Sequence, residues 1–127
     1  MHVDLSSKTA VVTGGSSGIG LAAAELFLEA GANVAICGRD GTKLDEVKNK
    51  LVGIHDEKRI LSYSCDVLNR GEVEAFASEV EKKFGGVDML INNAGQARVS
   101  TFSSTTEEDW REELELKFFS IIHCSKV

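Results

Sequence analysis

The hydrophobic positions alternate between two kinds of segment along most of the chain. Short runs of β-branched and other apolar residues predict buried strands, because unbroken apolar runs are typical of strands that are covered on both faces. Between these runs, apolar residues recur every three or four positions, as they do on one side of a helix. The predicted strands are residues 9–13, 33–37, 59–65 and 87–91, and the predicted helices are residues 18–30, 41–52, 69–84 and 106–126.

The predicted helices also carry end signals. Gly31 follows the first helix, and Gly85 and Gly86 follow the third; a glycine just past the last turn is a common helix stop. The apolar positions that support the helices are Ile19, Leu21, Ala22, Leu26 and Phe27 in the first, Leu44, Val47, Leu51 and Val52 in the second, and Val73, Phe76, Ala77, Val80 and Phe84 in the third.

Strands that alternate with helices predict a parallel sheet with right-handed crossovers and helices on both faces. We therefore expect one domain over residues 1–127 with an α/β fold: a three-layer, doubly wound parallel sheet of the Rossmann type, incomplete at four strands. In such sheets ligands bind beyond the carboxyl ends of the strands. The glycine-rich loop, GRD, CDV and NNAG each follow a predicted strand, so one crevice should collect all four segments.

Composition narrows the class of partner. The formal net charge is -6 at pH 7 and no stripe of Lys and Arg runs along the chain, so we expect no nucleic-acid partner. No apolar run approaches the roughly 20 residues of a membrane span, and the first residues lack a secretory signal pattern. Cys37, Cys65 and Cys124 form neither a CxxC pair nor a zinc pattern, so we predict no metal site. An odd cysteine count without a framework favours a reducing compartment, and we expect a cytoplasmic protein.

A loop with four glycines, Gly14, Gly15, Gly18 and Gly20, joins the first strand to the first helix. Glycine lets the backbone approach a ligand closely, and the N–H groups and dipole at a helix start attract anions. An ordinary tight turn is the alternative interpretation. So many glycines at a strand-to-helix junction favour a phosphate-binding loop.

The loop excludes one kind of nucleotide. Gly15 and Gly20 have the spacing of a P-loop, but Leu21 and Ala22 stand where the lysine and the Ser or Thr would be, so nothing would hold the terminal phosphates of a triphosphate. The segment Gly18–Ala23 satisfies the dinucleotide pattern G-x-G-x-x-A. A dinucleotide is therefore the favoured ligand.

The end of the second predicted strand bears on the choice between NAD and NADP. NAD-binding proteins place an acidic residue there for the ribose 2′-hydroxyl, but this chain has Gly38, followed by Arg39. A guanidinium can bind a 2′-phosphate through two hydrogen bonds, so we favour NADP over NAD. An exposed arginine is also often only a surface charge. Asp40 is expected to cap the next helix.

Three motifs in order resemble the classical short-chain dehydrogenases/reductases: Thr13–Gly20 matches TGxxxGIG, Asn92–Gly95 matches NNAG, and Asp66-Val67 matches the adenine-contacting pair. The resemblance implies that the loop lines the pyrophosphate and ribose, that Asp66 bonds the adenine amino group, and that NNAG passes under the ribose. Alternatives are a helix N-cap for Asp66 and turn formation for the asparagines. With Arg39, the expected cofactor site comprises Gly14, Gly15, Ser16, Ser17, Gly18, Ile19, Gly20, Arg39, Asp66, Val67, Asn93, Ala94 and Gly95.

Members of this family transfer hydride between a nicotinamide and a carbonyl or alcohol substrate, and they use a Tyr-x-x-x-Lys pair. The single tyrosine of this chain, Tyr63, lies in a predicted strand with Val67 four positions later, so we expect it to be structural and assign no catalytic residue. The family fold is about twice as long. We expect this chain to be the cofactor-binding half of a longer, homo-oligomeric enzyme. A non-catalytic dinucleotide-binding or interaction module of 127 residues is the alternative.

The last predicted helix departs from the family. Aligned from Trp110, the position of an asparagine that holds a relay water in the family is Lys117. Either a different relay or a solvent-facing lysine fits this replacement. His123 and Cys124 are adjacent, but neighbouring helical residues point in different directions, so we expect no catalytic pair there.

Overall fold

The computed structural model describes residues 3–16, 18–93, 106–108 and 124–125. Most of the predicted helix 106–126, including Lys117, lies outside these residues. No helix among the described residues has the length and apolar character to cross a bilayer. The elements are β1 (Thr9–Thr13), α1 (Gly18–Glu29), β2 (Asn33–Gly38), α2 (Gly41–Val52), the 3₁₀ turn η1 (Glu57–Arg59), β3 (Ile60–Ser64), α3 (Arg70–Phe84) and β4 (Met89–Asn92).

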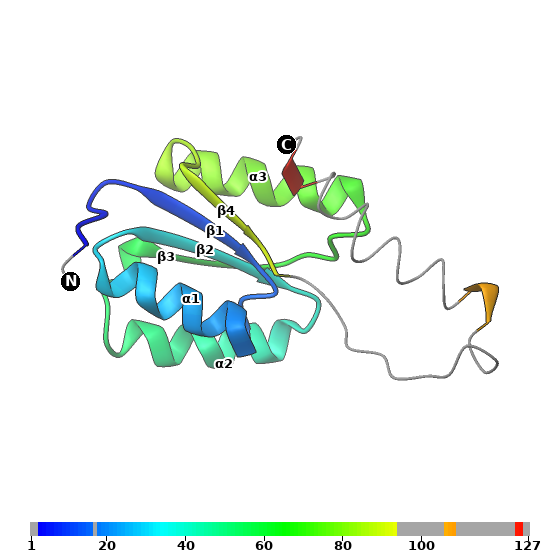
Figure 1. Ribbon diagram of the computed structural model, residues 1–127, viewed down its shortest axis with the longest axis horizontal. Helices are drawn as coiled ribbons and strands as arrows, with labels where there is room; N and C mark the ends of the chain where they lie inside the picture. The colour runs from blue at the N-terminus through cyan, green and yellow to red at the C-terminus, as the bar shows by residue number, and fades with distance from the viewer. Residues whose placement is uncertain (1–2, 17, 94–105, 109–123, 126–127) are drawn as a thin grey trace.

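The strands form one parallel sheet in the order β3-β2-β1-β4. The chain moves outward from β1 through β2 to β3, and then returns to place β4 on the other side of β1. In Figure 1, α1 and α2 cover one face of the sheet and α3 lies on the other. This arrangement confirms the predicted doubly wound fold.

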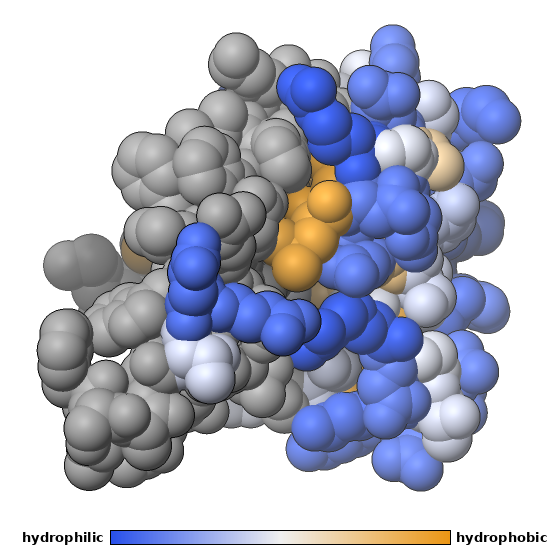
Figure 2. Space-filling model, turned by 90° about the vertical axis from the view of Figure 1, so that its right-hand side faces the viewer, coloured by the Kyte–Doolittle hydropathy of each residue, from blue (hydrophilic) through white to orange (hydrophobic). Residues whose placement is uncertain are grey.

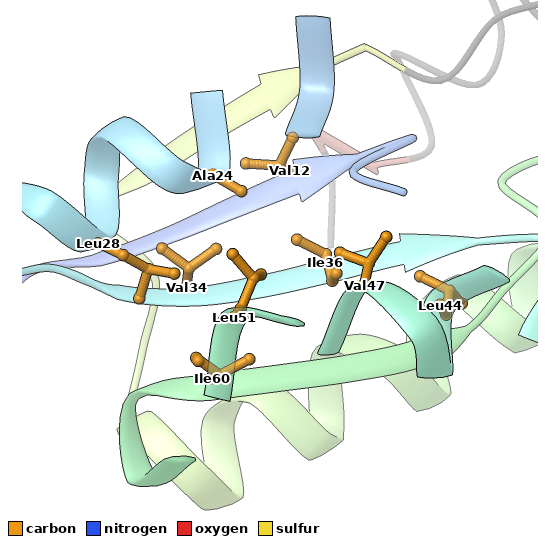
Figure 3. Packing of buried hydrophobic residues seen from close by; sticks show 9 residues of the cluster. All are labelled: Val12, Ala24, Leu28, Val34, Ile36, Leu44, Val47, Leu51 and Ile60. Atoms are coloured by element: carbon orange, nitrogen blue, oxygen red, sulfur yellow. The ribbon is translucent and has the colours of Figure 1, made fainter. Parts of the chain in front are cut away.

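The two central strands are buried on both faces, which explains their unbroken apolar runs. Successive side chains of a strand point to opposite faces, so Val34 and Ile36 of β2 pack under α1 and α2 while Ala35 and Cys37 pack under α3. Figure 3 shows the first cluster, in which side chains from both helices meet the strands. Its members are Val12, Ala24, Leu28, Val34, Ile36, Leu44, Val47, Leu51 and Ile60.

Helix α1 turns a different side to the sheet from the one that its largest apolar residues suggest. Ile19 and Leu26 are 79% and 66% exposed. The buried residues are Gly20, Ala24 and Leu28, which lie four positions apart and therefore on one side of the helix. The apolar content correctly predicts a helix here, but the contact with the sheet is centred on Gly20, Ala24 and Leu28 and leaves Ile19 and Leu26 outside it.

The helix ends follow their predicted signals. Asp40 Oδ1 accepts the Lys43 N–H at 3.1 Å and caps α2, while Asn69 caps the start of α3. Gly85 ends α3 with φ of 83° and Gly31 follows α1 with φ of 96°, a backbone region that glycine enters without steric cost. Predicted and observed boundaries of the described elements differ by at most two residues, which is the usual uncertainty at element ends.

Arg59 fastens the end of α1 to the sheet. Its Nη2 donates to Leu28 O at 2.6 Å and to Ala32 O at 2.8 Å. The first carbonyl belongs to the last turn of α1, where intrahelical donors run out and a cation is favoured. Arg59 immediately precedes β3. One side chain therefore joins the end of α1 and the residue before β2 to the start of β3.

We expect Arg59→Met to lower the free energy of unfolding by about 1–3 kcal/mol, because two half-buried carbonyls lose a charged donor. Chemical denaturation followed by circular dichroism measures the change. Lys58→Met is the matched control, since Lys58 is an exposed neighbour and its loss should cost less than about 0.5 kcal/mol. Equal losses in both variants would contradict the fastening role.

Candidate functional site

The carboxyl ends of the four strands lie side by side. Thr13 at the end of β1 pairs with Cys37 of β2 and with Asn92 of β4, and Gly38 pairs with Ser64 of β3. Because β2 and β4 leave β1 in opposite directions, a crevice is expected beyond β1, where ligands of such sheets bind. Figure 2 looks onto this end of the molecule and shows hydrophobic side chains between hydrophilic ones.

The first two amides of the glycine loop form hydrogen bonds within the protein. Gly14 N and Gly15 N donate to Cys37 O at 2.9 and 3.3 Å, so these N–H groups face β2. The first amides of α1, from Gly18 onward, have no carbonyl within the helix to bond. A phosphate in this crevice would therefore be held by the start of α1, where the dipole also favours negative charge.

Two glycines let α1 lie close against the sheet. A Cβ at Gly15 would stand 2.6 Å from Ile36 Cγ2, and a Cβ at Gly20 would overlap the carbonyl oxygen of Gly14 and approach Asn93 Nδ2 to 2.5 Å. Gly14 and Gly18 have φ of 68° and 59°, which bends the loop between strand and helix. The glycine spacing therefore serves the packing of the loop as well as ligand access.

A small polar network joins the glycine loop to the end of β4. Asn93 Nδ2 donates to Gly14 O at 3.3 Å and Asn93 N donates to Thr13 Oγ1 at 3.0 Å. The same hydroxyl donates to Ile91 O at 3.3 Å. Asn93 thus fixes the glycine loop and the end of β4 relative to each other. Ser17, Ala94 and Gly95 of the predicted site lie outside the described residues.

At the end of β2, Arg39 supplies a cation, and glycine stands at position 38, where NAD-binding proteins have an acidic residue. Arg39 is exposed, and no hydrogen bond or ion pair engages its side chain within the described part of the chain. A Cβ at Gly38 would stand 3.4 Å from Ser16 Oγ, so the serine hydroxyl of the glycine loop adjoins this position. The carboxylate of Asp40 is occupied by the cap of α2.

Asp66 does not cap α3, which excludes the N-cap alternative. Its Oδ1 accepts the Leu68 N–H at 3.0 Å, and the cap is Asn69, which accepts the Glu72 N–H at 3.1 Å. Asp66 is half-buried, whereas Val67 is buried in the apolar cluster beneath α3. The turn that follows Asp66 therefore engages one oxygen of its carboxylate.

Two features concern residues without a predicted role in the site. Tyr63 lies in β3 and stacks on Phe76 with ring centroids 5.7 Å apart, which confirms its structural role. Cys37 and Cys65 lie in one buried cluster, which their spacing in the sequence does not suggest. Their positions near the ends of adjacent parallel strands could have predicted that they are neighbours. No group of His, Cys, Asp or Glu among the described residues has the arrangement to hold a metal ion.

Comparison with known proteins shows the family. Residues 8–127 match the family model described as short chain dehydrogenase. The match covers nearly the whole chain, and the three motifs of the sequence lie within it. This chain therefore belongs to the short-chain dehydrogenase family.

Similar proteins come from several bacteria. The uncharacterized oxidoreductase DltE of Bacillus subtilis is 37% identical over 123 residues, 95% of this chain and 46% of that protein. An NADPH-bound short chain oxidoreductase from Pseudomonas aeruginosa PAO1, containing an atypical catalytic center, is 54% identical with a TM-score of 0.93, covering 98% of this chain and 48% of that one. L-sorbose reductase from Gluconobacter frateurii, complexed with NADPH and L-sorbose, is 35% identical with a TM-score of 0.91, covering 99% and 48%. The chain spans about half the length of these proteins.

We expect Gly20→Ala to lower the free energy of unfolding by about 1–3 kcal/mol, as is typical when volume is forced into a packed contact. The added methyl group must displace the Gly14 carbonyl or the Asn93 side chain. Gly41→Ala is the control at the start of the neighbouring helix α2, where no atom lies within 4 Å of the new Cβ. That change should stabilise by a few tenths to about 1 kcal/mol. Urea denaturation that leaves both variants equally stable would contradict this packing.

Proposed function

We propose that this chain binds NADP(H) for an oxidoreductase of the short-chain type, which transfers hydride between the nicotinamide and a carbonyl or alcohol substrate. The observation that carries the proposal is the exposed Arg39 beside Gly38 and Ser16, at the sheet edge where the glycine loop starts α1. The start of α1 can bind one phosphate, and Arg39 supplies a cation for a second phosphate at the same edge of the sheet. NADP carries phosphate at both places.

The pyrophosphate would lie at the start of α1. The amides of Gly14 and Gly15 donate to Cys37 O. We therefore assign the phosphate contacts to the later amides of the loop and to the hydroxyl groups of Ser16 and Ser17. Ile19 is 79% exposed and would cover the ribose from the side of α1. A helix N-terminus favours the doubly negative pyrophosphate without a lysine.

The 2′-phosphate would lie between Arg39 and Ser16. The guanidinium offers two parallel N–H donors, and the small Gly38 leaves room beside the serine hydroxyl. An acidic side chain at position 38 would repel a phosphate there and would instead bind the ribose hydroxyl of NAD. Two similar solved proteins contain NADPH, which supports the same preference in this chain.

The adenine would lie over the ends of β2 and β3. Asp66 Oδ1 is held by the Leu68 N–H, and a carboxylate has a second oxygen with acceptor capacity. We assign that oxygen to the adenine amino group, with Val67 beneath the ring. Asn93, Ala94 and Gly95 would pass under the ribose on the β4 side. The hydrogen bond from the Asn93 side-chain amide to Gly14 O supports this assignment, because it holds Asn93 beside the glycine loop.

We propose the hydride-transfer step for the whole protein and not for this chain alone. When bound, the cofactor supplies or accepts the hydride, and the substrate is a small carbonyl or alcohol compound. We assign no proton donor in this chain, since Tyr63 packs on Phe76. Homo-oligomeric assembly and a cytoplasmic location remain predictions. Tight NADPH binding with no turnover by the whole protein would favour the non-catalytic alternative.

We expect Arg39→Asp to reverse the cofactor preference. The wild-type protein should bind NADPH at least about tenfold more tightly than NADH, because a charge-assisted pair of hydrogen bonds is worth about 1.5–3 kcal/mol. The variant should lose that advantage and favour NADH, since the new carboxylate repels the phosphate. Isothermal titration calorimetry with both cofactors measures the ratio.

Lys58→Asp is the control for charge. It makes the same change in net charge, at an exposed residue before the amino end of β3 and so at the opposite end of the sheet. Its ratio of NADPH to NADH affinity should stay within about twofold of the wild type, because surface charges beyond about 10 Å are screened. Equal affinities of the wild-type protein for NADPH and NADH would overturn the assignment of Arg39.

We further propose that the proton relay of the whole protein departs from the family pattern at Lys117. The Pseudomonas protein contains an atypical catalytic center, and this chain has a lysine where the family has asparagine. Lys117→Asn should therefore shift the pH dependence of kcat for the full-length enzyme, whereas Lys117→Arg should keep a cation there and change it less. Superimposable pH profiles for all three proteins would contradict a relay role.

A further inference from the structure

The first turn of α3 is bonded back to the segment that follows β3. Asp66 N donates to Glu72 Oε1 at 3.4 Å, and Glu72 is a half-buried residue of that first turn. The residue before Asp66 is still bonded to the sheet, because Cys65 N donates to Gly38 O at 2.9 Å. The Glu72 side chain therefore supplies an acceptor directly after the last amide that β2 bonds.

This contact differs from an ordinary helix cap. Asn69 is the N-cap of α3, and its Oδ1 accepts the Glu72 N–H at 3.1 Å. In a capping box, an acid at the position of Glu72 accepts in return from the N–H of the cap residue. Here Asn69 N donates instead to Asp66 O at 2.9 Å. Glu72 thus reaches past the cap and bonds the amide of Asp66.

Asp66 is held at three of its atoms. Its N donates to Glu72, its O accepts the Asn69 N–H, and its Oδ1 accepts the Leu68 N–H at 3.0 Å. The first two bonds fix the peptide groups on both sides of the Asp66 Cα, and so the direction in which the side chain leaves the backbone. Among the three partners, only Glu72 acts through a side chain, so its contribution can be removed by substitution.

A second role of Glu72 must be separated from this one. An acid in the first turn of a helix is favoured by the helix dipole, whatever else it bonds. The ion pairs formed by the described residues do not include Glu72. The dipole effect requires the negative charge, whereas the bond to Asp66 N requires only an acceptor oxygen. Glutamine keeps the oxygen and removes the charge, so it distinguishes the two roles.

We propose that Glu72 is a positioning residue for the adenine end of the cofactor site. By accepting the Asp66 N–H, it fixes the direction of the Asp66 carboxylate and thereby contributes to the selection of a purine that carries a 6-amino group. This inference rests on the proposed function, in which Asp66 accepts from the adenine amino group. Glu72 itself does not contact the cofactor.

The selection follows from the chemistry of a carboxylate. An ionised carboxylate only accepts hydrogen bonds, so it bonds the amino group of adenine. Hypoxanthine has a carbonyl oxygen at that place, and two acceptors that face each other cannot bond. A carboxylate that loses its fixed direction loses both the gain with adenine and the penalty with hypoxanthine. The effect of Glu72 should therefore appear in the ratio of the two affinities.

The test compares NADPH with deamino-NADPH, in which hypoxanthine replaces adenine, by isothermal titration calorimetry on the whole protein. The wild-type protein should bind NADPH at least about tenfold more tightly, as expected for a hydrogen bond to a charged group. Glu72→Ala should reduce this ratio about threefold or more, while the affinity for deamino-NADPH stays within about twofold. An unchanged ratio in Glu72→Ala would overturn the proposal.

Two further variants separate positioning from charge and from folding. Glu72→Gln keeps an acceptor oxygen and should hold the ratio within about twofold of the wild type. Glu74→Ala removes the same side chain from an exposed position of the same helix and should leave the ratio unchanged. Equal losses in the alanine and glutamine variants at position 72 would overturn the role of the hydrogen bond. Circular dichroism confirms that each variant is folded.

Amide hydrogen exchange gives a readout that needs no cofactor. Glu72→Ala should speed the exchange of the Asp66 N–H about tenfold, because its acceptor is removed, and Glu72→Gln should change it little. The Cys65 N–H is the internal reference, since it bonds Gly38 O and should exchange at the same rate in all three proteins. NMR resolves the two amides. Unchanged exchange at Asp66 in Glu72→Ala would contradict the hold of Glu72 on this turn.

The outcomes also separate this inference from the proposed function. A wild-type protein that does not bind NADPH would overturn the proposed function, and the exchange rate of the Asp66 N–H would still decide whether Glu72 holds the turn. A wild-type protein that binds NADPH and deamino-NADPH equally would keep the cofactor but overturn the assignment of Asp66 to adenine, and the role of Glu72 with it.

Discussion

The close approach of α1 to the sheet is the constraint on which the rest of the structure depends. Gly15 lies against Ile36, and Gly20 lies against the Gly14 carbonyl and the Asn93 amide. Any side chain at these glycines would push α1 away from the sheet. With α1 in place, Asn93 bonds Gly14 and the ends of β1 and β4 lie side by side.

The parallel register of the strands brings the ends of β2, β3 and β4 to the same edge of the sheet as the end of β1. All four strands end at nearly the same level, so residues far apart in the sequence become neighbours. Local hydrogen bonds then distribute the polar groups: Asp40 caps α2, Asn69 caps α3, and Asp66 forms a turn of its own. Arg39 is an exposed cation at this edge, and the NADP(H) site that we propose depends on it.

The face of the sheet under α3 carries an apolar cluster that includes two cysteines. The strand ends that carry Arg39 and Asp66 also carry Cys37 and Cys65, which point to the opposite side from the cluster under α1 and α2. Alternation along β2 separates the two sides: Ile36 packs against Gly15 of the glycine loop, and Cys37 packs beneath α3. β2 therefore contributes side chains to both layers of the core.

The sequence by itself determined the succession of strands and helices, the cap at Asp40, the glycine helix stops and the family motifs, because periodicity, turn residues and short motifs are local properties of the chain. It did not determine the buried side of α1, since Ile19 and Leu26 are as apolar as Leu28 and only contact with the sheet distinguishes them. It also did not distinguish a cap from a turn at Asp66, or pair Cys37 with Cys65. Those outcomes depend on register and packing between distant segments, which only the tertiary structure decided.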